Sequence, residues 1–300
     1  MNKFSQRLNE DIELIDKALC RYLGGEGDST CGSYYHRELF AFSGRADSLC
    51  KPLMSSMEYS LMSGGKRIRP VLTLEFCRML NGDTDAALRM GAALEMVHTY
   101  SLIHDDLPCM DDDDIRRGKP TNHKVYGEST AVLAGDGLLT HAFSVLAQNM
   151  DESPLRYLNA VQILAESAGI RGMVGGQQMD LAGESKRLTR EEHEEMTLRK
   201  TGELIRAACL LGCAASDASK EAQAAAEKYA YGIGLAFQII DDILDMGTED
   251  EKTTFLSFYS VDGAREYARR LTDSAIDAIR DYPQNEFLVQ LAEALHQRKI

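Results

Sequence analysis

Apolar residues recur along most of this chain at the three- and four-residue spacing of a helix with one buried face. Residues 6 to 23 form the first such stretch. Its apolar positions are Leu8, Ile12, Ile15, Leu19 and Leu23. The run GGEGDSTCGS that follows breaks the pattern with glycine and small polar residues, which predicts a loop.

Helical spacing dominates again from Leu53 onward. The stretches that carry it are PLMSSMEYSLMSGG, VLTLEFCRML, the segment from Ala86 to His104, AVLAGDGLLTHAFSVLAQNM and VQILAESAGIRGMVGGQQM. Thr189 and Glu192 have the spacing of a capping box, which predicts a helix through HEEMTLRKTGELIRAACLLGCAA. A further helix is predicted from about Ala222 to Asp245, and no strand alternation of useful length is present.

Composition supports long helices and one domain. Only 6 prolines and no tryptophan occur, and 44% of the residues are hydrophobic, so a sizeable core can be buried. We find no shift in composition that marks a boundary and no repeat at a solenoid period. The sequence therefore predicts a single all-α domain over residues 1–300.

The net charge of −14 excludes some partners. It repels polyanions at long range, so nucleic acid is not expected to bind and any phosphate site needs local cations.

The 7 cysteines form no C-x-x-C pair and are expected to be reduced thiols. The first residues lack a continuous apolar run, so we expect neither a signal peptide nor a membrane helix, no stable membrane insertion, and a cytoplasmic protein.

Six aspartates lie within ten residues in the segment HTYSLIHDDLPCMDDDDIRRGKP. They are Asp105, Asp106 and Asp111 to Asp114. A solvated acidic turn is the simplest alternative interpretation. The residues SLIH before Asp105 are apolar and helical, however, so the first two carboxylates are predicted to emerge from the end of a packed helix.

A second acidic cluster occurs in GIGLAFQIIDDILDMG. Gln238, Asp241 and Asp245 fall at i, i+3 and i+7 there, on one stripe of a helix. Carboxylates among apolar residues are costly without a counter-charge. Oxygen ligands without cysteine or histidine indicate a hard cation, and Mg²⁺ bound with a diphosphate suits them better than a Ca²⁺ cage.

Basic residues gather in two places that could each hold a diphosphate. Arg116 and Arg117 follow the first acidic cluster, and GGKRIRP supplies Lys66 and Arg69 at a loop-to-helix junction. Glycine lets the backbone approach an anion, and arginine offers bidentate contacts to phosphate. An ordinary basic helix start paired with surface acids is the alternative interpretation of GGKRIRP.

Three further residues are candidates for ligand contact. His98 precedes Asp105 by seven residues, so two helical turns place it roughly 10 Å away on the same side. A histidine satisfied within the core is the alternative. Lys200 and Thr201, in the helix that follows the capping box, are candidates on a similar argument.

Taken together, these segments resemble the polyprenyl (trans-isoprenyl) diphosphate synthase family over nearly the whole chain from GGKRIRP onward. HDDLPCMDDDDIRRGKPTNHKVYGE is similar to its first aspartate-rich motif and FQIIDDILD to its second. GGQQMDL is similar to its central glycine-glutamine turn and RKTGELIRAA to its lysine-threonine helix. The resemblance implies an antiparallel helical bundle around a deep central cavity, a homodimer, and aspartate motifs that face each other across the cavity mouth.

The resemblance also implies roles for individual residues. The implied metal ligands, for about three Mg²⁺ ions, are Asp105, Asp106, Asp111, Asp241 and Asp245. Arg116 is implied to hold an allylic diphosphate. Isopentenyl diphosphate is implied to contact Lys66, Arg69, His98 and Arg117, with Gln177 of GGQQMDL as a further substrate contact. Lys200, Thr201 and Gln238 are implied to line the reacting centre, with Asp105 and Asp241.

The implied reaction breaks the C1–O bond of an allylic diphosphate and adds the isopentenyl double bond to the resulting cation. Cations at the diphosphate and dipoles that do not attack the carbon are therefore required. No residue is an obvious general base, and the resemblance suggests that released diphosphate takes the proton. Tyr100, five residues before Asp105, resembles an aromatic floor that stops elongation at fifteen carbons; an ordinary core aromatic is the alternative.

The chain departs from the family pattern after the second motif. Asp245 runs through MGTEDE directly to Lys252 and Thr253, so the usual glycine-lysine loop is shortened and Lys252 is the nearest replacement for its lysine. The stretch from Gly24 to Lys51 is longer than usual. Three alternatives remain open: a geranylgeranyl diphosphate synthase, a non-catalytic helical partner subunit of a synthase, and a terpene cyclase, which DDILD disfavours.

Overall fold

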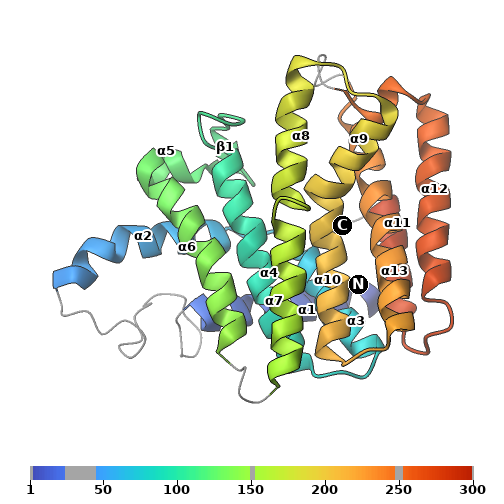
Figure 1. Ribbon diagram of the computed structural model, residues 1–300, viewed down its shortest axis with the longest axis horizontal. Helices are drawn as coiled ribbons and strands as arrows, with labels where there is room; N and C mark the ends of the chain where they lie inside the picture. Colours follow the sequence, from blue (N-terminus) through green and yellow to red (C-terminus); the bar gives the residue numbers. More distant parts are fainter. Residues whose placement is uncertain (1–2, 24–44, 149–152, 247–252, 299–300) are drawn as a thin grey trace. The chain divides into compact units, whose positions relative to one another are not determined.

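A computed structural model describes residues 3–23, 45–148, 153–246 and 253–298 of the chain (Figure 1). Helices make up nearly all of the regular structure there, which confirms the all-α prediction. The strands in these ranges, β1 (Ile115–Arg116) and β2 (Lys119–Pro120), form a short antiparallel hairpin with Arg116 opposite Lys119. The loop predicted at GGEGDSTCGS lies outside the described residues.

The helices follow one another along the chain with short connections. Their bounds are α1 Lys3–Leu23, α2 Arg45–Leu61, α3 Ile68–Met79, α4 Thr84–Asp105, α5 Asn122–Tyr126, α6 Glu128–Ala147, α7 Pro154–Ala168, α8 Met173–Ser185, α9 Arg190–Thr197, the π-helix η1 Leu198–Gly202, α10 Glu203–Ala215, α11 Lys220–Leu244, the 3₁₀ turn η2 Phe255–Ser257, α12 Val261–Ala278 and α13 Glu286–His296.

Two predicted helical stretches are interrupted. The one through VQILAESAGIRGMVGGQQM breaks between α7 and α8, where a Cβ on Gly172 would lie 2.0 Å from the carbonyl oxygen of Ser167. The one that begins at the capping box is split by the π-helix η1. The box itself is confirmed, because the Thr189 side chain accepts from Glu192 N and the Glu192 side chain accepts from Thr189 N.

The chain divides into two compact units. The first comprises residues Met1–Val71 and Leu88–Glu152, and the second comprises Leu72–Ala87 and Ser153–Ile300. α3 and α4 contribute residues to both units, because the chain passes from one unit to the other after Val71, inside α3, and after Ala87, inside α4. The predicted single domain over residues 1–300 stays a prediction.

In the first unit, the middle of α4 is almost completely buried, from Gly91 through Val97. This explains why its sequence lacks a polar face. α6 packs against α2 and α5. Among the described helices, α6 is also the one that is long and apolar enough to cross a membrane. Core helices of water-soluble proteins can meet the same criteria of length and composition.

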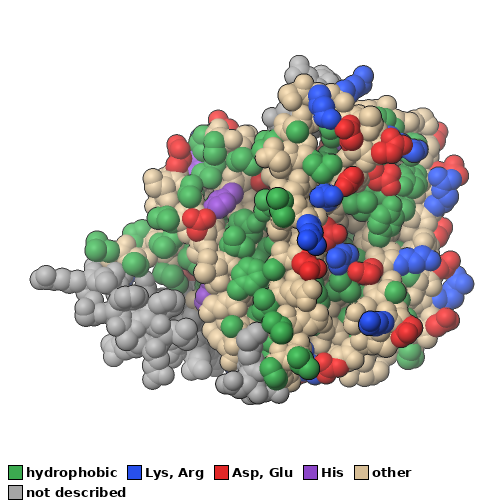
Figure 2. Space-filling view, in the orientation of Figure 1, with side chains coloured by type: hydrophobic (Ala, Val, Ile, Leu, Met, Phe, Trp, Pro, Cys, Tyr) green, Lys and Arg blue, Asp and Glu red, His purple; other side chains and the backbone are tan. Residues whose placement is uncertain are grey.

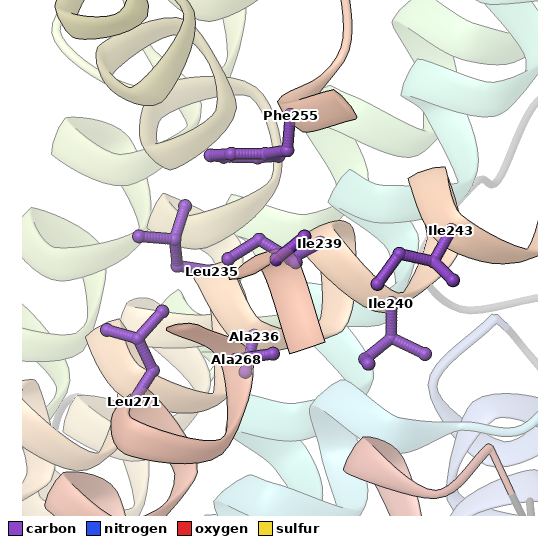
Figure 3. Close-up of a cluster of buried hydrophobic side chains, with 9 residues drawn as sticks. Leu235, Ala236, Ile239, Ile240, Ile243, Phe255, Ala268 and Leu271 are labelled. Atoms are coloured by element: carbon purple, nitrogen blue, oxygen red, sulfur yellow. The ribbon is translucent and has the colours of Figure 1, made fainter. Parts of the chain in front are cut away.

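The second unit is built around α10 and α11. α10 is buried continuously from Ala207 to Ala215, and α11 packs along α10 and α12. One apolar cluster joins α11 and α12 to η2, and Leu235, Ile239 and Phe255 are among its buried side chains (Figure 3). On the face shown in Figure 2, acidic and basic side chains are interspersed over α9 to α12, as on an ordinary solvated surface.

Candidate active site

The GGKRIRP loop of the first unit adopts backbone conformations that depend on its glycines. Gly64 and Gly65 have φ of 88° and 132°. A Cβ on Gly65 would lie 2.8 Å from the guanidinium of Arg117, and Arg117 Nη1 donates to the carbonyl oxygen of Gly64. The glycines therefore allow Arg117, from the hairpin that follows the first aspartate motif, to dock on this loop.

Arg69 and His98 meet beside this loop. Arg69 Nη1 lies 3.4 Å from His98 Nε2, and both side chains are half-buried. Burial lowers the pKa of His98 well below its usual value, and the charges of Arg69 and Arg117 lower it further. The histidine is therefore neutral at pH 7 and accepts from the guanidinium. With exposed Lys66 on the same loop, the four residues predicted to bind isopentenyl diphosphate lie in one part of the first unit.

A further cation in this region, Arg67, was not singled out by the sequence. Arg67 is 3% exposed and has a left-handed backbone, with φ of 49°. It donates to Asp16 Oδ1 at 2.9 Å, to Glu95 Oε1 at 2.9 Å and to the carbonyl oxygen of Leu61 at 2.8 Å. Arg67 thus ties α1, α2 and α4 together and fixes the loop from inside.

The first aspartate motif begins where α4 ends. Asp105 is half-buried, Asp111 is exposed, and the backbone N–H of Asp111 donates to the carbonyl of Asp105 at 2.9 Å, which closes the turn. Asp106 is 3% exposed and accepts from Arg116 Nε at 2.5 Å. Burial raises the pKa of Asp106, and the ion pair with Arg116 opposes that shift.

Arg116, predicted to hold an allylic diphosphate, is therefore engaged with carboxylates here. Its second contact is Nη2 to Asp113 Oδ2 at 3.1 Å. Arg116 also lines a small cavity, together with Asp106 and Arg117. The cavity has a volume of about 30 Å³, enough for a water molecule.

Tyr100 lies in the core of the first unit. It is 6% exposed, and its ring meets that of His104 edge-on at 5.7 Å. Burial, together with the nearby charge of Asp105, raises the pKa of Tyr100 to about 12, so the phenol is neutral. Its predicted role as a floor for the growing chain stays a prediction.

The second unit contains a cavity of about 480 Å³ that is lined by three of the residues predicted at the reacting centre, whereas Asp105 and Asp241 are not among its lining residues. Lys200, Thr201 and Gln238 all line it, although they come from η1 and α11. The remaining lining residues are Asp180, Gly183, Leu188, His193, Met196, Thr197, Asp242, Thr253, Thr254 and Phe255. Lys200 Nζ donates to Asp180 Oδ2 at 2.5 Å, which holds the ammonium at the cavity.

The π-helix that carries Lys200 is placed by a close backbone approach. A Cβ on Gly176 of α8 would lie 2.2 Å from the backbone nitrogen of Lys200, so only glycine fits there. Single π-turns within helices are often found at functional sites. Gln177, the next residue of α8, is half-buried but is not among the residues that line the cavity.

The second aspartate motif divides its carboxylates between two environments. Asp242 lines the cavity with Gln238, and its Oδ2 accepts from the backbone N–H of Phe255 at 2.6 Å. Asp241 forms an ion pair with Arg298, whose guanidinium lies 4.9 Å from the ring centre of Phe237. Asp245 is exposed where α11 ends, and Lys252 lies outside the described residues.

The carboxylates fit a hard divalent cation that is completed by a substrate. Over the described ranges, no three histidine, cysteine, aspartate or glutamate side chains converge as a metal cage. Mg²⁺ usually binds one or two carboxylates, keeps several waters and takes its other ligands from phosphate. The oxygen-only donors of both motifs suit that mode, and Arg116 and Arg298 neutralise Asp106 and Asp241 in the structure described here.

The cationic clusters, the carboxylates and the cavity of this all-α chain are the features that an enzyme of diphosphate chemistry requires. The polyprenyl synthetase family model matches residues 50–254. The chain therefore belongs to the polyprenyl synthetase family and is a prenyltransferase.

Individual relatives support this assignment. Farnesyl diphosphate synthase of Geobacillus stearothermophilus is 44% identical over 249 residues, 82% of this chain and 77% of the relative. Geranylgeranyl diphosphate synthase of Cyanophora paradoxa is 42% identical over 242 residues, 76% of this chain and 81% of that relative. The crystal structure of an FPP/GFPP synthase from Zymomonas mobilis superposes with a TM-score of 0.84 at 35% identity, covering 96% of this chain and 97% of the other.

Proposed function

We propose that this protein joins isopentenyl diphosphate head-to-tail with dimethylallyl or geranyl diphosphate and releases diphosphate, with farnesyl diphosphate as its product. The observation that carries the proposal is the meeting of Lys200, Thr201 and Gln238 in one cavity of the second unit. The names of the relatives in Geobacillus and Haemophilus, both farnesyl diphosphate synthases, support the fifteen-carbon product.

In this proposal, the first unit binds isopentenyl diphosphate through Lys66, Arg69, Arg117 and neutral His98. Two contacts support these roles: Arg69 contacts His98, and Arg117 docks on the glycine loop. Guanidinium groups bind phosphate oxygens in pairs, so the anionic end is fixed and the double bond is left free to react.

The second unit acts at the allylic carbon. The ammonium of Lys200 supplies a fixed positive charge near the departing diphosphate, and the hydroxyl of Thr201 and the amide of Gln238 orient their dipoles toward the developing carbocation. These neutral groups stabilise the positive charge without capturing it. Arg116 exchanges its carboxylate partners for phosphate oxygens of the allylic substrate.

We further propose that Mg²⁺, in about three ions, is the cofactor, with Asp105, Asp106 and Asp111 of the first motif and Asp241 and Asp245 of the second as its ligands. When bound, Mg²⁺ supplies Lewis-acid neutralisation of the leaving diphosphate.

We also propose a cytoplasmic homodimer. Val132 and Leu133 of α6, 40% and 55% exposed, are apolar side chains that a second copy could cover.

A second candidate is geranylgeranyl diphosphate synthesis, which the name of the Cyanophora paradoxa relative favours. Purified protein incubated with Mg²⁺, isopentenyl diphosphate and geranyl diphosphate distinguishes the two when the products are separated by chromatography. A fifteen-carbon product supports the proposal, and a twenty-carbon product supports the alternative. Failure to condense would favour a non-catalytic partner subunit, and a product that persists with chelator would refute the role of Mg²⁺.

A further inference from the structure

His193, in α9, is a buried polar side chain that the proposed chemistry does not use. It is 5% exposed, and within the described residues neither of its ring nitrogens has a hydrogen-bond partner. Nearly all buried polar groups in proteins are hydrogen-bonded, and leaving one unsatisfied is costly. The two ring nitrogens therefore require a partner beyond the described residues, and a ligand bound in the cavity can supply one.

The ring is held in place by aromatic neighbours. Its centre lies 4.7 Å from that of Phe255, edge to face, and 6.0 Å from that of Phe258. Nε2 is 4.0 Å from Asp242 Oδ2, too far for a hydrogen bond, and that oxygen already accepts from Phe255 N. The same carboxylate thus fixes the segment that presents Phe255 to the histidine.

The unused nitrogens belong to a ring that lines the 480 Å³ cavity together with Lys200, Thr201 and Gln238. This volume is many times that of a water molecule. Burial lowers the pKa of His193, against the opposing charges of Asp180 and Glu194, so the ring is neutral at pH 7. A neutral imidazole offers one N–H donor and one acceptor, which suits a phosphate oxygen on one side and a water or hydroxyl on the other.

We propose that His193 is a substrate-contacting residue, whose ring N–H donates a hydrogen bond to an oxygen of the diphosphate held beside Lys200. This inference rests on the proposed function, because that function places a diphosphate in the cavity. It adds to the predicted site a residue from α9, a helix that contributes no other predicted contact.

Two substitutions separate a ligand contact from a core residue. His193→Leu removes both nitrogens and keeps an apolar side chain, whereas His193→Gln keeps an N–H donor near the position of Nε2. Binding of magnesium pyrophosphate, and of a non-reactive geranyl thiodiphosphate with Mg²⁺, is measured by calorimetry on the full chain. We expect His193→Leu to weaken binding about 10- to 100-fold, the effect of losing a hydrogen bond to a charged group. His193→Gln should recover part of that loss.

The same variants provide a check on folding. Replacing a buried polar group that lacks a partner by an apolar one is neutral or stabilising, so the thermal midpoint of His193→Leu should equal or exceed that of the parent. Retained stability with weakened binding supports a ligand contact. His141→Gln is the matched control, because His141 of α6 bonds to the Tyr22 carbonyl at 2.7 Å in the first unit and lies outside the cavity.

A spectroscopic readout tests the contact directly. In protein labelled with ¹⁵N at its 7 histidines, the His193 imidazole signals are identified by their loss in His193→Gln. We expect them to shift when magnesium pyrophosphate saturates the cavity, while binding of isopentenyl diphosphate alone leaves them unchanged. Unmoved signals, or binding by His193→Leu within about twofold of the parent, would overturn the inference and leave His193 as a core residue bridged by water.

These outcomes can be told apart from failure of the proposed function. A protein that condenses its substrates normally while the His193 signals do not respond refutes the inference alone. A protein whose pyrophosphate binding depends on His193, but which forms no condensation product, supports the contact and refutes the proposed reaction.

Discussion

Replacing Arg67 by methionine removes a buried cation on which three segments of the first unit depend. Its side chain is 1% exposed, and it donates to Asp16, Glu95 and the Leu61 carbonyl. Burial by itself lowers the pKa of Arg67, but the carboxylates of Glu95 and Asp16 outweigh burial and raise it. Methionine fills a similar volume, so the substitution mainly tests the charge.

The expected loss of stability follows from the burial of each partner. The Glu95 side chain is 3% exposed, so removing Arg67 strands a buried carboxylate, at a cost of about 3–5 kcal/mol. The Asp16 side chain is 39% exposed, and its pair contributes no more than about 1 kcal/mol. For 300 residues, an unfolding entropy of about 0.6 kcal/mol/K converts the larger figure into a fall of about 5–8 °C in Tm.

The assay is differential scanning calorimetry of the full chain. Arg67→Met combined with Glu95→Met should regain most of the lost Tm, because no buried charge is then left without a partner. Arg280→Met is the control, since its pair with Asp277 is exposed and should shift Tm by no more than about 2 °C.

The reasoning is refuted if Arg67→Met lowers Tm by no more than the control. A kinetic readout accompanies the stability measurement. Because Arg67 fixes the loop between Lys66 and Arg69, the variant should raise KM for isopentenyl diphosphate more than KM for the allylic substrate. Equal changes in both KM values would argue against a positioning role for Arg67.

Three further predictions follow from other contacts. Tyr100→Ala should give products longer than fifteen carbons in chromatographic assays, and an unchanged product would retire the floor hypothesis. Arg298→Ala removes the cation paired with Asp241, so the Mg²⁺ concentration for half-maximal activity should fall by up to about fivefold; an unchanged Mg²⁺ dependence would show that the pair does not compete with the metal. His98 has a native pKa well below its unfolded value of about 6.5, so the unfolded chain takes up the extra proton and stability falls as pH drops below about 6.5. His98→Gln should flatten that decline in urea midpoints between pH 7 and pH 5, whereas an identical slope would contradict it.

The helices were largely predictable because their signals are local. The first predicted helix, residues 6–23, lies within α1 at Lys3–Leu23, and the one predicted from about Ala222 to Asp245 matches α11 at Lys220–Leu244. The capping box at Thr189 involves atoms only three residues apart, so sequence spacing is enough to find it.

Part of the candidate site was predictable on the same grounds. Lys200, Thr201 and Gln238 are marked by motifs, and the structure brings them to one cavity. His193 lines the same cavity from α9, where nothing in the local pattern distinguishes it from a surface residue, and Asp180 of GGQQMDL lines it from α8, although the motif did not predict its ion pair with Lys200. Their contribution depends on which helix faces turn toward η1 and α11.

The sequence by itself determined the helical class, the helix positions and the residue types able to bind diphosphate and a hard cation, because periodicity and motif spacing are properties of neighbouring residues. Only the tertiary structure decided that Arg67 is the buried arginine of GGKRIRP, with Arg69 left to meet His98. It also decided that the helix through Lys200 takes a π-turn against Gly176. Both outcomes depend on contacts between segments far apart in the chain, and the pattern of neighbouring residues does not predict such contacts.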